Sequence, residues 1–320
     1  MKAICLRQFG GPEVLEYHED FPIPVPGDQD VLIRVKAAGV NPVDWKIREG
    51  LLQGRLPHTF PLIPGWDAAG VVEAVGDGTN PSSLKPGDEV YAYCRKPLIQ
   101  QGTYAEYCTM TMDHVVRKPS VLSFSEAASI PLAGLTAYQS LVDAAKVGAG
   151  QTVLIHAGAG GVGGFAIQIA KHLGATVITT GSAEKHAYLC ALGADVVIDY
   201  TAGDFREAVS QRYPDGVDVA FDTVGGDVQR ASADCVKSGG ALVSILALEH
   251  EAYVRSRGVE PLYVFVAPNG PQLARLASWI EQGALKTRIA GSYPLQEAAE
   301  AHRAIQTGRT AGKLVLTIDG

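Results

Sequence analysis

The sequence predicts an α/β protein in which a doubly wound parallel sheet is inserted into a mostly-β domain shaped as a partly closed barrel. Two different sequence patterns along the 320 residues support this prediction. Residues 1–121 contain short runs of strand composition separated by glycine and proline turns, which is typical of a barrel. In residues 122–266, apolar strand runs alternate with segments of helical periodicity, as in a parallel sheet with crossover helices. Residues 267–320 are expected to return to the first domain, because a sheet of this kind is complete at about six strands.

The first domain is predicted from short runs of residues that favour strands. Gly10-Gly11-Pro12 and the proline-rich segment 22–27 separate the earliest of these runs, as turns do. The predicted strands are residues 2–8, 14–19, 30–38, 70–75, 89–92 and 103–109.

The second domain is predicted from the alternation that begins after Pro119. Its predicted strands are residues 152–156, 176–180, 196–198, 217–222, 240–246 and 262–266, and its predicted helices are 124–129, 132–147, 161–173, 184–192, 205–212 and 228–236. Two helices, 272–282 and 295–307, and a strand, 313–318, follow in the C-terminal segment. Right-handed crossovers place the ligand crevice at the carboxyl ends of the parallel strands. We therefore expect a bound ligand in the cleft between the two domains.

A glycine turn follows the first strand of this alternation. The sequence there reads Gly158-x-Gly160-x-x-Gly163, with Gly161 and Val162 between the last two glycines. In a strand–turn–helix context the first glycine permits the turn, the second lets the backbone approach a pyrophosphate, and the third lets helix and strand pack closely. The amides of the helix N-terminus attract the anion. The turn therefore predicts a dinucleotide-binding site.

The composition indicates an ordinary globular protein. Hydrophobic residues make up 47% of the chain and charged residues 19%, and the net charge of −7 argues against a nucleic-acid partner. Neither a secretory leader nor an apolar run long enough to span a membrane is visible, so no membrane partner is expected. The five cysteines are scattered and form no Cys-x-x-Cys pair, which favours reduced thiols and a cytoplasmic location.

Several ordered stretches carry a family resemblance. They are residues 39–44, 64–72, 85–90, 102–107, 130–138, 157–163, 192–195 and 308–313. On these stretches the chain resembles the zinc-free medium-chain dehydrogenase/reductases, and within them the NADPH-dependent quinone oxidoreductase and alkenal reductase branch. The resemblance implies a GroES-like first domain, residues 1–121 and 267–320, and a Rossmann domain, residues 122–266, that binds NADPH.

No metal is expected. Zinc alcohol dehydrogenases of this superfamily place a cysteine ligand at the position matching Asn41, and a His-Glu pair at the position matching Trp66-Asp67. A carboxamide and an indole are not zinc ligands, whereas a thiolate and an imidazole are. The structural-zinc lobe of those enzymes needs four closely spaced cysteines. Here Cys94 and Cys108 are the cysteines of that region, and two core thiols are the simpler interpretation.

The end of the second predicted parallel strand favours NADPH over NADH. An NAD site would place Asp or Glu there to accept the ribose hydroxyls. Instead the sequence continues as Gly181-Ser182, with Lys185 in the next turn, and a hydroxyl and a cation suit a 2′-phosphate. The alternative for Lys185 is a solvated lysine at a helix start, and Glu184 is expected to turn outward. In the resembled family a tyrosine after the third strand also contacts this phosphate, and Tyr200 matches it.

The resemblance assigns the acceptor site to Asn41 and Asp44, with Thr136 on the nicotinamide side. Asn41 would donate a hydrogen bond to the reducible carbonyl oxygen, where charge develops during hydride transfer. The alternative is a turn asparagine before Pro42, where asparagine is favoured in any case. Asp44 would orient a ribose or the loop, and its alternative is an ordinary helix N-cap.

Aromatic residues near this loop predict a slot for a planar acceptor. Trp45 and Trp66 could line a quinone-sized pocket, although core packing is expected for at least one of them. Lys46 stands where relatives carry tyrosine, so a tyrosine proton donor is not available at that position. The histidines are dispersed and are interpreted as structural or surface residues. The proton is therefore expected from water or from a ribose hydroxyl, while the cofactor supplies the hydride.

Loops after the later strands match the cofactor-contact loops of the family. Val224 follows the fourth strand, and Leu246 and Ala247 follow the fifth; ordinary sheet-edge loops are the alternative. The sixth strand contains Phe265, which we expect near the cofactor and at an apolar edge that invites pairing. The family usually dimerises at this edge, so a homodimer is expected there.

These observations predict an NADPH-dependent reductase of quinones or α,β-unsaturated carbonyls that works by direct hydride transfer. The residues 41–44 and Lys46 also suit an alkenal or enoyl double-bond reductase with little quinone activity. A third possibility of another class is a non-catalytic NADPH-binding protein. The physiological acceptor depends on loop positions that the sequence does not reveal.

Overall fold

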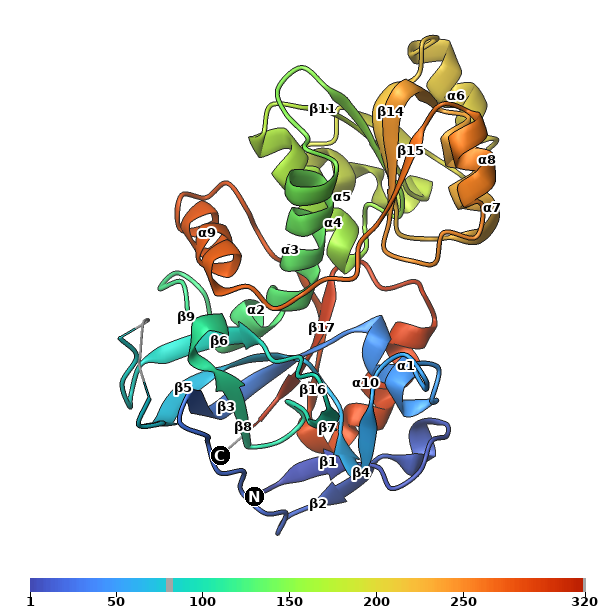
Figure 1. The fold of residues 1–320 in the computed structure, drawn as a ribbon. Coiled ribbons are helices and arrows are strands. Elements are labelled where there is room, and N and C mark those ends of the chain that lie inside the picture. Colours follow the sequence, from blue (N-terminus) through green and yellow to red (C-terminus); the bar gives the residue numbers. More distant parts are fainter. Residues whose placement is uncertain (79–82, 319–320) are drawn as a thin grey trace. The chain divides into compact units, whose positions relative to one another are not determined.

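The chain forms two compact units in the computed structural model, which describes residues 1–78 and 83–318 (Figure 1). Unit 1 contains Met1–Leu135, Ala267–Gly283 and Thr287–Gly320, and unit 2 contains Thr136–Val266 and Ala284–Lys286. The division falls at Leu135, whereas the sequence analysis places it at residue 121. The difference arises because the helix after residue 121 packs on the sheet of unit 1.

Unit 2 is built on a six-stranded parallel sheet. Its strands are β10 (Thr152–Ile155), β11 (Thr176–Thr180), β12 (Val196–Ile198), β13 (Val217–Asp222), β14 (Val236–Ser244) and β15 (Glu260–Tyr263). The order β12-β11-β10-β13-β14-β15 runs outward in both directions from the β10–β13 pair. A doubly wound sheet has its topological switch point at such a pair, beside the strand that leads into the glycine turn.

Helices cover both faces of this sheet (Figure 1). They are α4 (Gly161–His172), α5 (His186–Ala191), α6 (Phe205–Arg212), α7 (Gly226–Ala233) and α8 (Glu251–Ser256), with the 3₁₀ turn η4 (Ala183–Lys185). Val209, Ala233 and Val254 of α6, α7 and α8 share one core cluster with Leu154 and Ile178 of the sheet. Because side chains alternate along a strand, the neighbouring residues of β10 and β11 point to the other face, where α4 packs.

Unit 1 is built on a seven-stranded, mostly antiparallel sheet. Its strands are β3 (Asp30–Val40), β5 (Asp67–Val75), β6 (Glu89–Tyr93), β8 (Tyr107–Thr111), β9 (Val115–Arg117), β16 (Ile289–Pro294) and β17 (Lys313–Thr317). The order is β16-β17-β3-β5-β6-β9, with β8 also paired to β3. Within the described residues this path has two ends, so the sheet is open rather than a closed barrel. Two small sheets pair β1 (Ala3–Cys5) with β2 (Glu16–His18) and β4 (His58–Ile63) with β7 (Ile99–Gln101).

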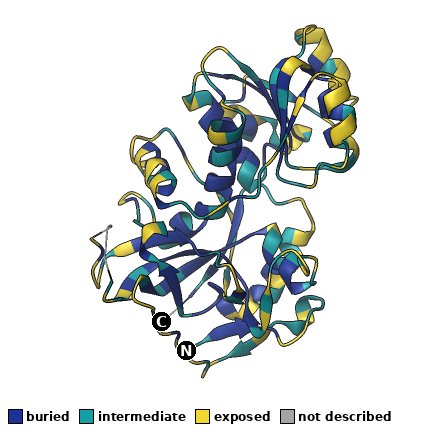
Figure 2. Cartoon of the chain, viewed as in Figure 1, coloured by how far each residue is buried: buried dark blue, intermediate teal, exposed yellow. Residues whose placement is uncertain are grey.

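Helices of unit 1 join its distant segments. They are α1 (Pro42–Arg48), α2 (Phe124–Ala128), α9 (Gly270–Glu281) and α10 (Ala298–Gln306), with the 3₁₀ turns η1 (Pro12–Val14), η2 (Met112–His114) and η5 (Leu295–Glu297). α1 packs against α10, and α10 packs against β17, so the C-terminal segment lies beside the first helix of the chain. The strands around β3 are largely buried, whereas the outer faces of the helices are exposed (Figure 2).

The prediction of a doubly wound parallel sheet joined to a mostly-β domain is confirmed, but several elements differ. The predicted helix 132–147 is α3 (Pro131–Tyr138) followed by the π-helix η3 (Gln139–Ala144). The predicted strand 262–266 is wrong at its end, because β15 stops at Tyr263 and Phe265 follows it. β16 was not predicted, because a glycine interrupts its strand pattern and a proline ends it.

No helix within residues 1–78 and 83–318 combines the length and the apolar character that crossing a membrane requires.

Candidate active site

The junction of β3 and α1 places two of the predicted acceptor residues inside unit 1. Asn41 occupies the N-cap of α1, and Pro42 stands at the first helical position, where its missing N–H costs nothing. The backbone N–H of Asn41 donates to Asp44 Oδ2 at 2.8 Å. This contact turns the Asp44 side chain back over the helix start. Both side chains are buried.

The carboxamide of Asn41 lies between a carboxylate and an ammonium group. Its Nδ2 donates to Asp67 Oδ2 at 2.9 Å, and its Oδ1 accepts a hydrogen bond from Lys313 Nζ. Asp67 and Lys313 begin β5 and β17, two of the antiparallel neighbours of β3. The strand register therefore brings these three residues together at the end of β3, although they are far apart in the sequence.

A directional chain of hydrogen bonds ends on Asp44. Tyr104 Oη donates to Asp44 Oδ2 at 3.0 Å, and His302 Nε2 lies 3.3 Å from the same Tyr104 oxygen. Arg48 Nη1 lies 3.1 Å from His302 Nδ1. A guanidinium can only donate, so Nδ1 accepts and Nε2 carries the proton that is given to Tyr104. Asp44 Oδ1 is buried without a hydrogen-bond partner among the described residues.

Burial dominates the proton affinities of this network. It raises the pKa of Asp44 to about 7, against the hydrogen bonds from Asn41 and Tyr104, while the neighbouring Asp67 raises it further. It raises the pKa of Asp67 to about 6, and the Lys313 ammonium opposes this rise. Burial lowers the pKa of Lys313 itself, which the two carboxylates counteract. The site thus holds groups that can change charge near neutral pH.

Thr136, the predicted nicotinamide-side residue, lies on a helix whose N-terminus is bound by the Asp67 carboxylate. Asp67 Oδ1 accepts the backbone N–H of Leu132, in the first turn of α3, at 2.8 Å. A carboxylate at a helix N-terminus satisfies an orphan N–H and favours the helix dipole. Thr136 is buried one turn further along the same helix. Asp67 therefore links the N-terminus of the Thr136 helix to Asn41.

The two predicted slot tryptophans have different environments. Trp66 is buried and packs edge-on against Tyr93, with ring centroids 6.0 Å apart. Trp45 is half-buried, and the Lys46 ammonium lies 5.8 Å from its ring centroid. Gly65, just before Trp66, has φ +91°, and a Cβ there would lie 2.3 Å from the Tyr104 ring. Trp66 is thus a packed core residue, as expected for at least one of the pair.

The three glycines of the turn in unit 2 are needed for different reasons, some by the fold and one by a ligand. A Cβ on Gly158 would lie 2.0 Å from Thr179 Oγ1, and one on Gly163 would lie 2.4 Å from the Ala157 carbonyl oxygen. These two glycines are required by the protein's own packing. At Gly160, by contrast, the nearest atom is the Ala157 oxygen at 3.3 Å. A close approach of a phosphate to this backbone explains a glycine at position 160, so the turn fits a dinucleotide.

The helix after the turn presents an anion-binding terminus. Gly161 and Val162 are its first residues and are half-buried, and the first turn of α4 contains no acidic residue. α4 runs for twelve residues, so its dipole is well developed. Together with the space beside Gly160, this terminus meets the requirements of a pyrophosphate.

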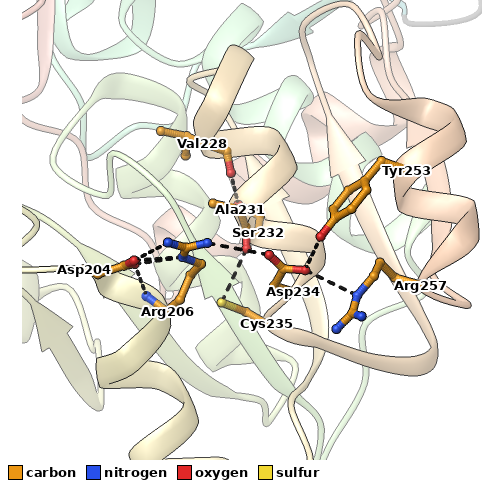
Figure 3. Close-up of polar contacts among 9 residues, drawn as sticks. All are labelled: Asp204, Arg206, Val228, Ala231, Ser232, Asp234, Cys235, Tyr253 and Arg257. Atoms are coloured by element: carbon orange, nitrogen blue, oxygen red, sulfur yellow. Dashed lines mark hydrogen bonds and ion pairs between the residues drawn. The ribbon is translucent and has the colours of Figure 1, made fainter.

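A buried histidine anchors the turn. His156 follows β10, and its ring lies 3.2 Å from Thr180 Oγ1 on one side and 2.8 Å from Ser232 Oγ of α7 on the other. Ser232 also donates to the Val228 carbonyl at 2.6 Å, as Figure 3 shows. Burial lowers the pKa of His156 to about 4, so the ring is neutral. His156 is therefore a structural residue, as the sequence analysis expected.

A polar cluster holds the far end of α7 (Figure 3). Asp234 accepts from Tyr253 Oη at 2.6 Å and pairs with Arg257 at 3.2 Å and with Arg206 at 3.7 Å. These contacts join the start of α6, the end of α7 and α8 into one layer. They stabilise the helix that begins after the predicted loop containing Val224.

The predicted phosphate residues lie around the end of β11. Gly181 is buried, and a Cβ there would lie 2.5 Å from Leu189 Cδ1. Glu184 is exposed, as expected, but it does not turn away from Ser182, because Ser182 Oγ donates to Glu184 Oε1 at 3.3 Å. The cause is the 3₁₀ turn η4, which replaces the predicted helix start and bends Glu184 back. Lys185 follows in the same turn.

The remaining predicted residues lie in surface loops. Tyr200, in the turn after β12, is 58% exposed, and Val224 is also exposed. Both can be reached by a ligand, whereas Phe265 is half-buried beyond the end of β15.

One buried aspartate organises two of the predicted cofactor loops. Asp222 Oδ1 accepts the backbone N–H groups of Val224 at 2.9 Å and Gly225 at 2.8 Å. Its Oδ2 accepts from Ser244 Oγ and from Gln229 Nε2. Gln229 also donates to the Ala247 carbonyl at 3.0 Å, and the N–H of Leu246 donates to Ser244 Oγ at 3.1 Å. The loops with Val224 and with Leu246-Ala247 are thus held by one network.

Sequence reasoning missed several residues of these networks. Asp67 was considered only as a position where zinc enzymes carry a metal ligand, and Lys313 appeared only within a resembling stretch. Tyr104 and Asp222 were assigned no role, and His302 was grouped with the structural or surface histidines. A usable signal existed for Asp67 and Lys313, because each is a charged residue beside an apolar strand. No such signal marks His302, whose partners lie far away in the sequence.

The fold and these networks together indicate the class of protein. A doubly wound sheet with a phosphate-compatible glycine turn, in one chain with a mostly-β unit that contains a buried polar site, is the architecture of a nicotinamide-dependent oxidoreductase.

Comparisons with known proteins identify the family. Residues 27–120 match the alcohol dehydrogenase GroES-like domain, and residues 192–316 match the family described as zinc-binding dehydrogenase. The chain is 36% identical to 2-methylene-furan-3-one reductase of Solanum lycopersicum, over 99% of this chain and 79% of that protein. It is 35% identical to the chloroplastic NADPH-dependent alkenal/one oxidoreductase of Arabidopsis thaliana, with the same coverage of both chains.

A solved structure agrees with these relatives. The quinone oxidoreductase of Coxiella burnetii superposes with a TM-score of 0.90 at 38% identity, covering 100% of this chain and 99% of that one. The chain therefore belongs to the medium-chain dehydrogenase/reductase superfamily, in the branch of quinone oxidoreductases and alkenal reductases. It is an oxidoreductase of a family that uses a nicotinamide cofactor.

Proposed function

We propose that the protein reduces quinones or α,β-unsaturated carbonyl compounds with NADPH, by direct hydride transfer and without a metal ion. The observation that carries this proposal is the buried arrangement of Asn41, Asp67 and Lys313. It offers a neutral hydrogen-bond donor, next to a fixed cation, where a carbonyl oxygen gains charge during reduction. The named activities of the relatives support the same substrate class.

The proposed division of roles is simple. When bound, the nicotinamide supplies the hydride. Asn41 holds the carbonyl oxygen of the acceptor, and Asp44 keeps Asn41 in place by accepting its backbone N–H. Thr136 contacts the nicotinamide side, and Trp45 offers an apolar surface to a planar acceptor. Quinones and activated alkenes need little acid catalysis, so positioning supplies much of the rate.

Independence from zinc is supported by the groups around Asn41. Lys313 Nζ donates to Asn41 Oδ1 and to the Val40 carbonyl, so the group beside Asn41 is an ammonium cation rather than a zinc ligand. Among the described residues, Cys5, Glu16 and His18 do bring ligand atoms within 4.8 Å of one another. Glu16 there is already contacted by Arg7 and His18.

The preference for NADPH rests on the turn after β11. Ser182 and Lys185 supply a hydroxyl and a cation, and the exposed Tyr200 supplies a second hydroxyl in the turn after β12. Binding of a 2′-phosphate requires Ser182 to exchange its Glu184 contact for the phosphate. The glycine turn with Gly158, Gly160, Gly161, Val162 and Gly163, and the loops with Gly181, Val224, Leu246, Ala247 and Phe265, complete the proposed cofactor contacts.

A second candidate is an alkenal reductase with little quinone activity. The two curated relatives described above favour it, because both are named for enone or alkenal substrates. Trp66 bears on the choice, since its burial removes one wall from the proposed quinone slot.

We also propose a homodimer and a cytoplasmic location. β15 lies at the edge of its sheet, which supports pairing there, although Pro261 removes one donor from the strand. The five cysteines are free, and four of them are buried, which suits a reducing compartment.

A steady-state screen tests the proposed function. The protein is assayed with a 1,2-quinone, a 1,4-quinone and a short enal, each with NADPH and with NADH, alongside metal analysis of the same sample. We expect turnover with NADPH exceeding that with NADH, and zinc well below one equivalent. Turnover of the enal alone would establish the second candidate. Tight NADPH binding without turnover of any acceptor would instead indicate a binding protein.

A further inference from the structure

Lys313 is a buried ammonium group in the middle of the proposed acceptor site. It stands first in β17, and its side chain is 6% exposed. Nζ donates to the Val40 carbonyl at 3.2 Å and to Asn41 Oδ1, and it lies 3.8 Å from Asp67 Oδ2. A lysine is rarely buried without a reason, because its charge is expensive to desolvate.

The contacts on either side of Asn41 determine which way its carboxamide points. An ammonium group can only donate, so it selects the amide oxygen, and an ionised carboxylate can only accept, so Asp67 selects the amide nitrogen. The two ends of a carboxamide have nearly the same shape, and packing alone distinguishes them poorly. The charges of Lys313 and Asp67 therefore fix the orientation of Asn41.

The orientation has a chemical consequence. The Asn41 nitrogen carries two hydrogens, and one of them is donated to Asp67. The second remains for a ligand oxygen. A cation bound to the amide oxygen draws electron density from the nitrogen and makes its N–H a stronger donor.

We propose that Lys313 is a positioning residue for hydride transfer, which orients and polarises the Asn41 carboxamide so that one N–H meets the carbonyl oxygen of the acceptor. The inference rests on the proposed function, because it assigns a task to Asn41 in that reaction. Lys313 itself contacts neither substrate nor cofactor in this scheme; it acts through Asn41.

The ionised state of Asp67 is essential to this scheme. The groups that act on Asp67 or feel its charge are Lys313, Asp44, Tyr93, Cys94 and Tyr104. Among them Lys313 is the cation, and it lowers the pKa of Asp67 against the rise caused by burial. Without Lys313 the carboxyl group stays protonated to a higher pH. A protonated Asp67 can donate to Asn41 Oδ1 and turn the carboxamide around.

The test compares Lys313→Met with Lys118→Met. Lys118 is a matched control, because it is a lysine of unit 1 with a 5% exposed side chain that donates to backbone carbonyls, those of Pro119 and Leu122. The measurements are kcat/KM for a quinone and an enal from pH 5 to 9, and NADPH affinity by fluorescence titration.

For Lys313→Met we expect kcat/KM at pH 7 to fall roughly 10²-fold, as for loss of one oxyanion donor, while NADPH affinity changes less than about twofold. The pH profile of kcat/KM reports ionisations of the free enzyme. Its acid limb should therefore move to higher pH, because Asp67 stays protonated to a higher pH without Lys313. Lys118→Met should keep the wild-type limb. If the two variants lose the same activity with the same unshifted limb, Lys313 is merely structural and the inference is overturned.

A second variant keeps the inference testable if Lys313→Met does not fold. Asp67→Asn removes the charge that selects the Asn41 nitrogen, and we expect a lowered kcat/KM whose acid limb no longer reports this carboxyl group. An Asp67→Asn profile identical to wild type would overturn the inference. Failure of the proposed function looks different, since the wild-type protein would then turn over none of the acceptors.

Discussion

Asp44 and Asp67 are buried carboxylates that share one network, and burial makes both easier to protonate than in water. His302 in the same network has the opposite preference. Burial, with the neighbouring Arg48, lowers its pKa to about 3 and keeps it neutral. At the residue scale, burial in unit 1 therefore favours the neutral form of all three side chains. The two carboxyl groups keep a proton to a higher pH, and the imidazole stays unprotonated to a lower pH.

Replacing Asp44 with Asn should make stability less sensitive to pH. The folded pKa of Asp44, about 7, lies above its unfolded value, so the folded state binds more protons and loses stability as pH rises from about 4 to 7. The variant lacks this loss, which for one proton is at most about 1.4 kcal/mol per pH unit. Urea unfolding from pH 4 to 8 measures it. A variant that follows the wild type at every pH, as exposed Asp113→Asn should, would contradict the assignment.

Lys185→Ala tests the proposed phosphate site. We expect NADPH to bind roughly 10- to 100-fold more weakly, which corresponds to loss of one charge-assisted hydrogen bond of about 1.5–3 kcal/mol, with little effect on NADH. Isothermal titration with both cofactors measures the difference. Lys171→Ala is the control, because that lysine pairs with Asp195 at the surface of the same unit. Equal losses for NADPH and NADH would exclude a 2′-phosphate contact at Lys185.

At the scale of elements, the glycine turn combines two kinds of constraint. Gly158 and Gly163 are needed because neighbouring atoms leave no room for a Cβ, whereas Gly160 has extended backbone angles and more open space. The turn is anchored by His156, whose ring contacts one hydroxyl at the end of β11 and one in α7. The fold and the ligand thus require different glycines of one motif.

Alanine substitutions separate these constraints. Gly160→Ala should change the free energy of unfolding by about 1 kcal/mol or less, because alanine readily adopts the extended backbone angles found at this position. It should still weaken NADPH binding, since the Cβ occupies the path of the phosphate. Gly158→Ala should destabilise the protein by about 1–3 kcal/mol through overpacking. Thermal melts and NADPH titrations measure both effects; unchanged NADPH affinity in Gly160→Ala would refute the cofactor assignment of this turn.

His156→Gln should reduce the loss of stability in acid. The folded pKa of His156, about 4, lies below its unfolded value, so the unfolded state binds the proton and stability falls as pH drops from about 6.5 to 4. The variant is less stable at pH 7, but its deficit should narrow towards pH 4. Urea midpoints across this range measure the trend. His172→Gln, at an exposed position of α4, should show no such narrowing.

At the scale of the whole molecule, the chain closes unit 1 from both of its ends. α10 packs against α1 and η1, and β17 pairs with β3, so the C-terminal segment completes a sheet begun by the N-terminal segment. Lys313 enters the proposed site only through this return of the chain. The proposed site therefore forms only when the C-terminal segment has paired with the sheet of unit 1.

Dimerisation through β15 is testable at this scale. We expect light scattering to give about twice the chain mass of 33.7 kDa. Tyr263→Lys, which adds a charge at an exposed position of the edge strand, should shift the mass towards the monomer, because charged edges resist pairing. A wild-type monomer would disprove the dimer, and a dimer unaffected by Tyr263→Lys would place its interface elsewhere.

Much of the fold was predictable because its signals are local. Strand runs followed by helical periodicity predicted the parallel sheet, and the spacing of Gly158, Gly160 and Gly163 predicted the turn. Predictions failed where tertiary contacts decide local geometry. Glu184 turns back because a 3₁₀ turn precedes α5, and β16 forms despite a glycine and a proline because β17 pairs with it.

By itself, the sequence determined the fold class and the glycine turn, and the family resemblance placed Asn41 where related enzymes bind zinc. These properties depend on residue type and on spacing within a few residues. The tertiary structure alone decided what surrounds Asn41. Asp67 and Lys313 reach it from strands on either side of β3, and Tyr104 and His302 reach Asp44 from still more distant segments. Strand register, which couples residues far apart in the chain, is the physical reason that this network could not be read in advance.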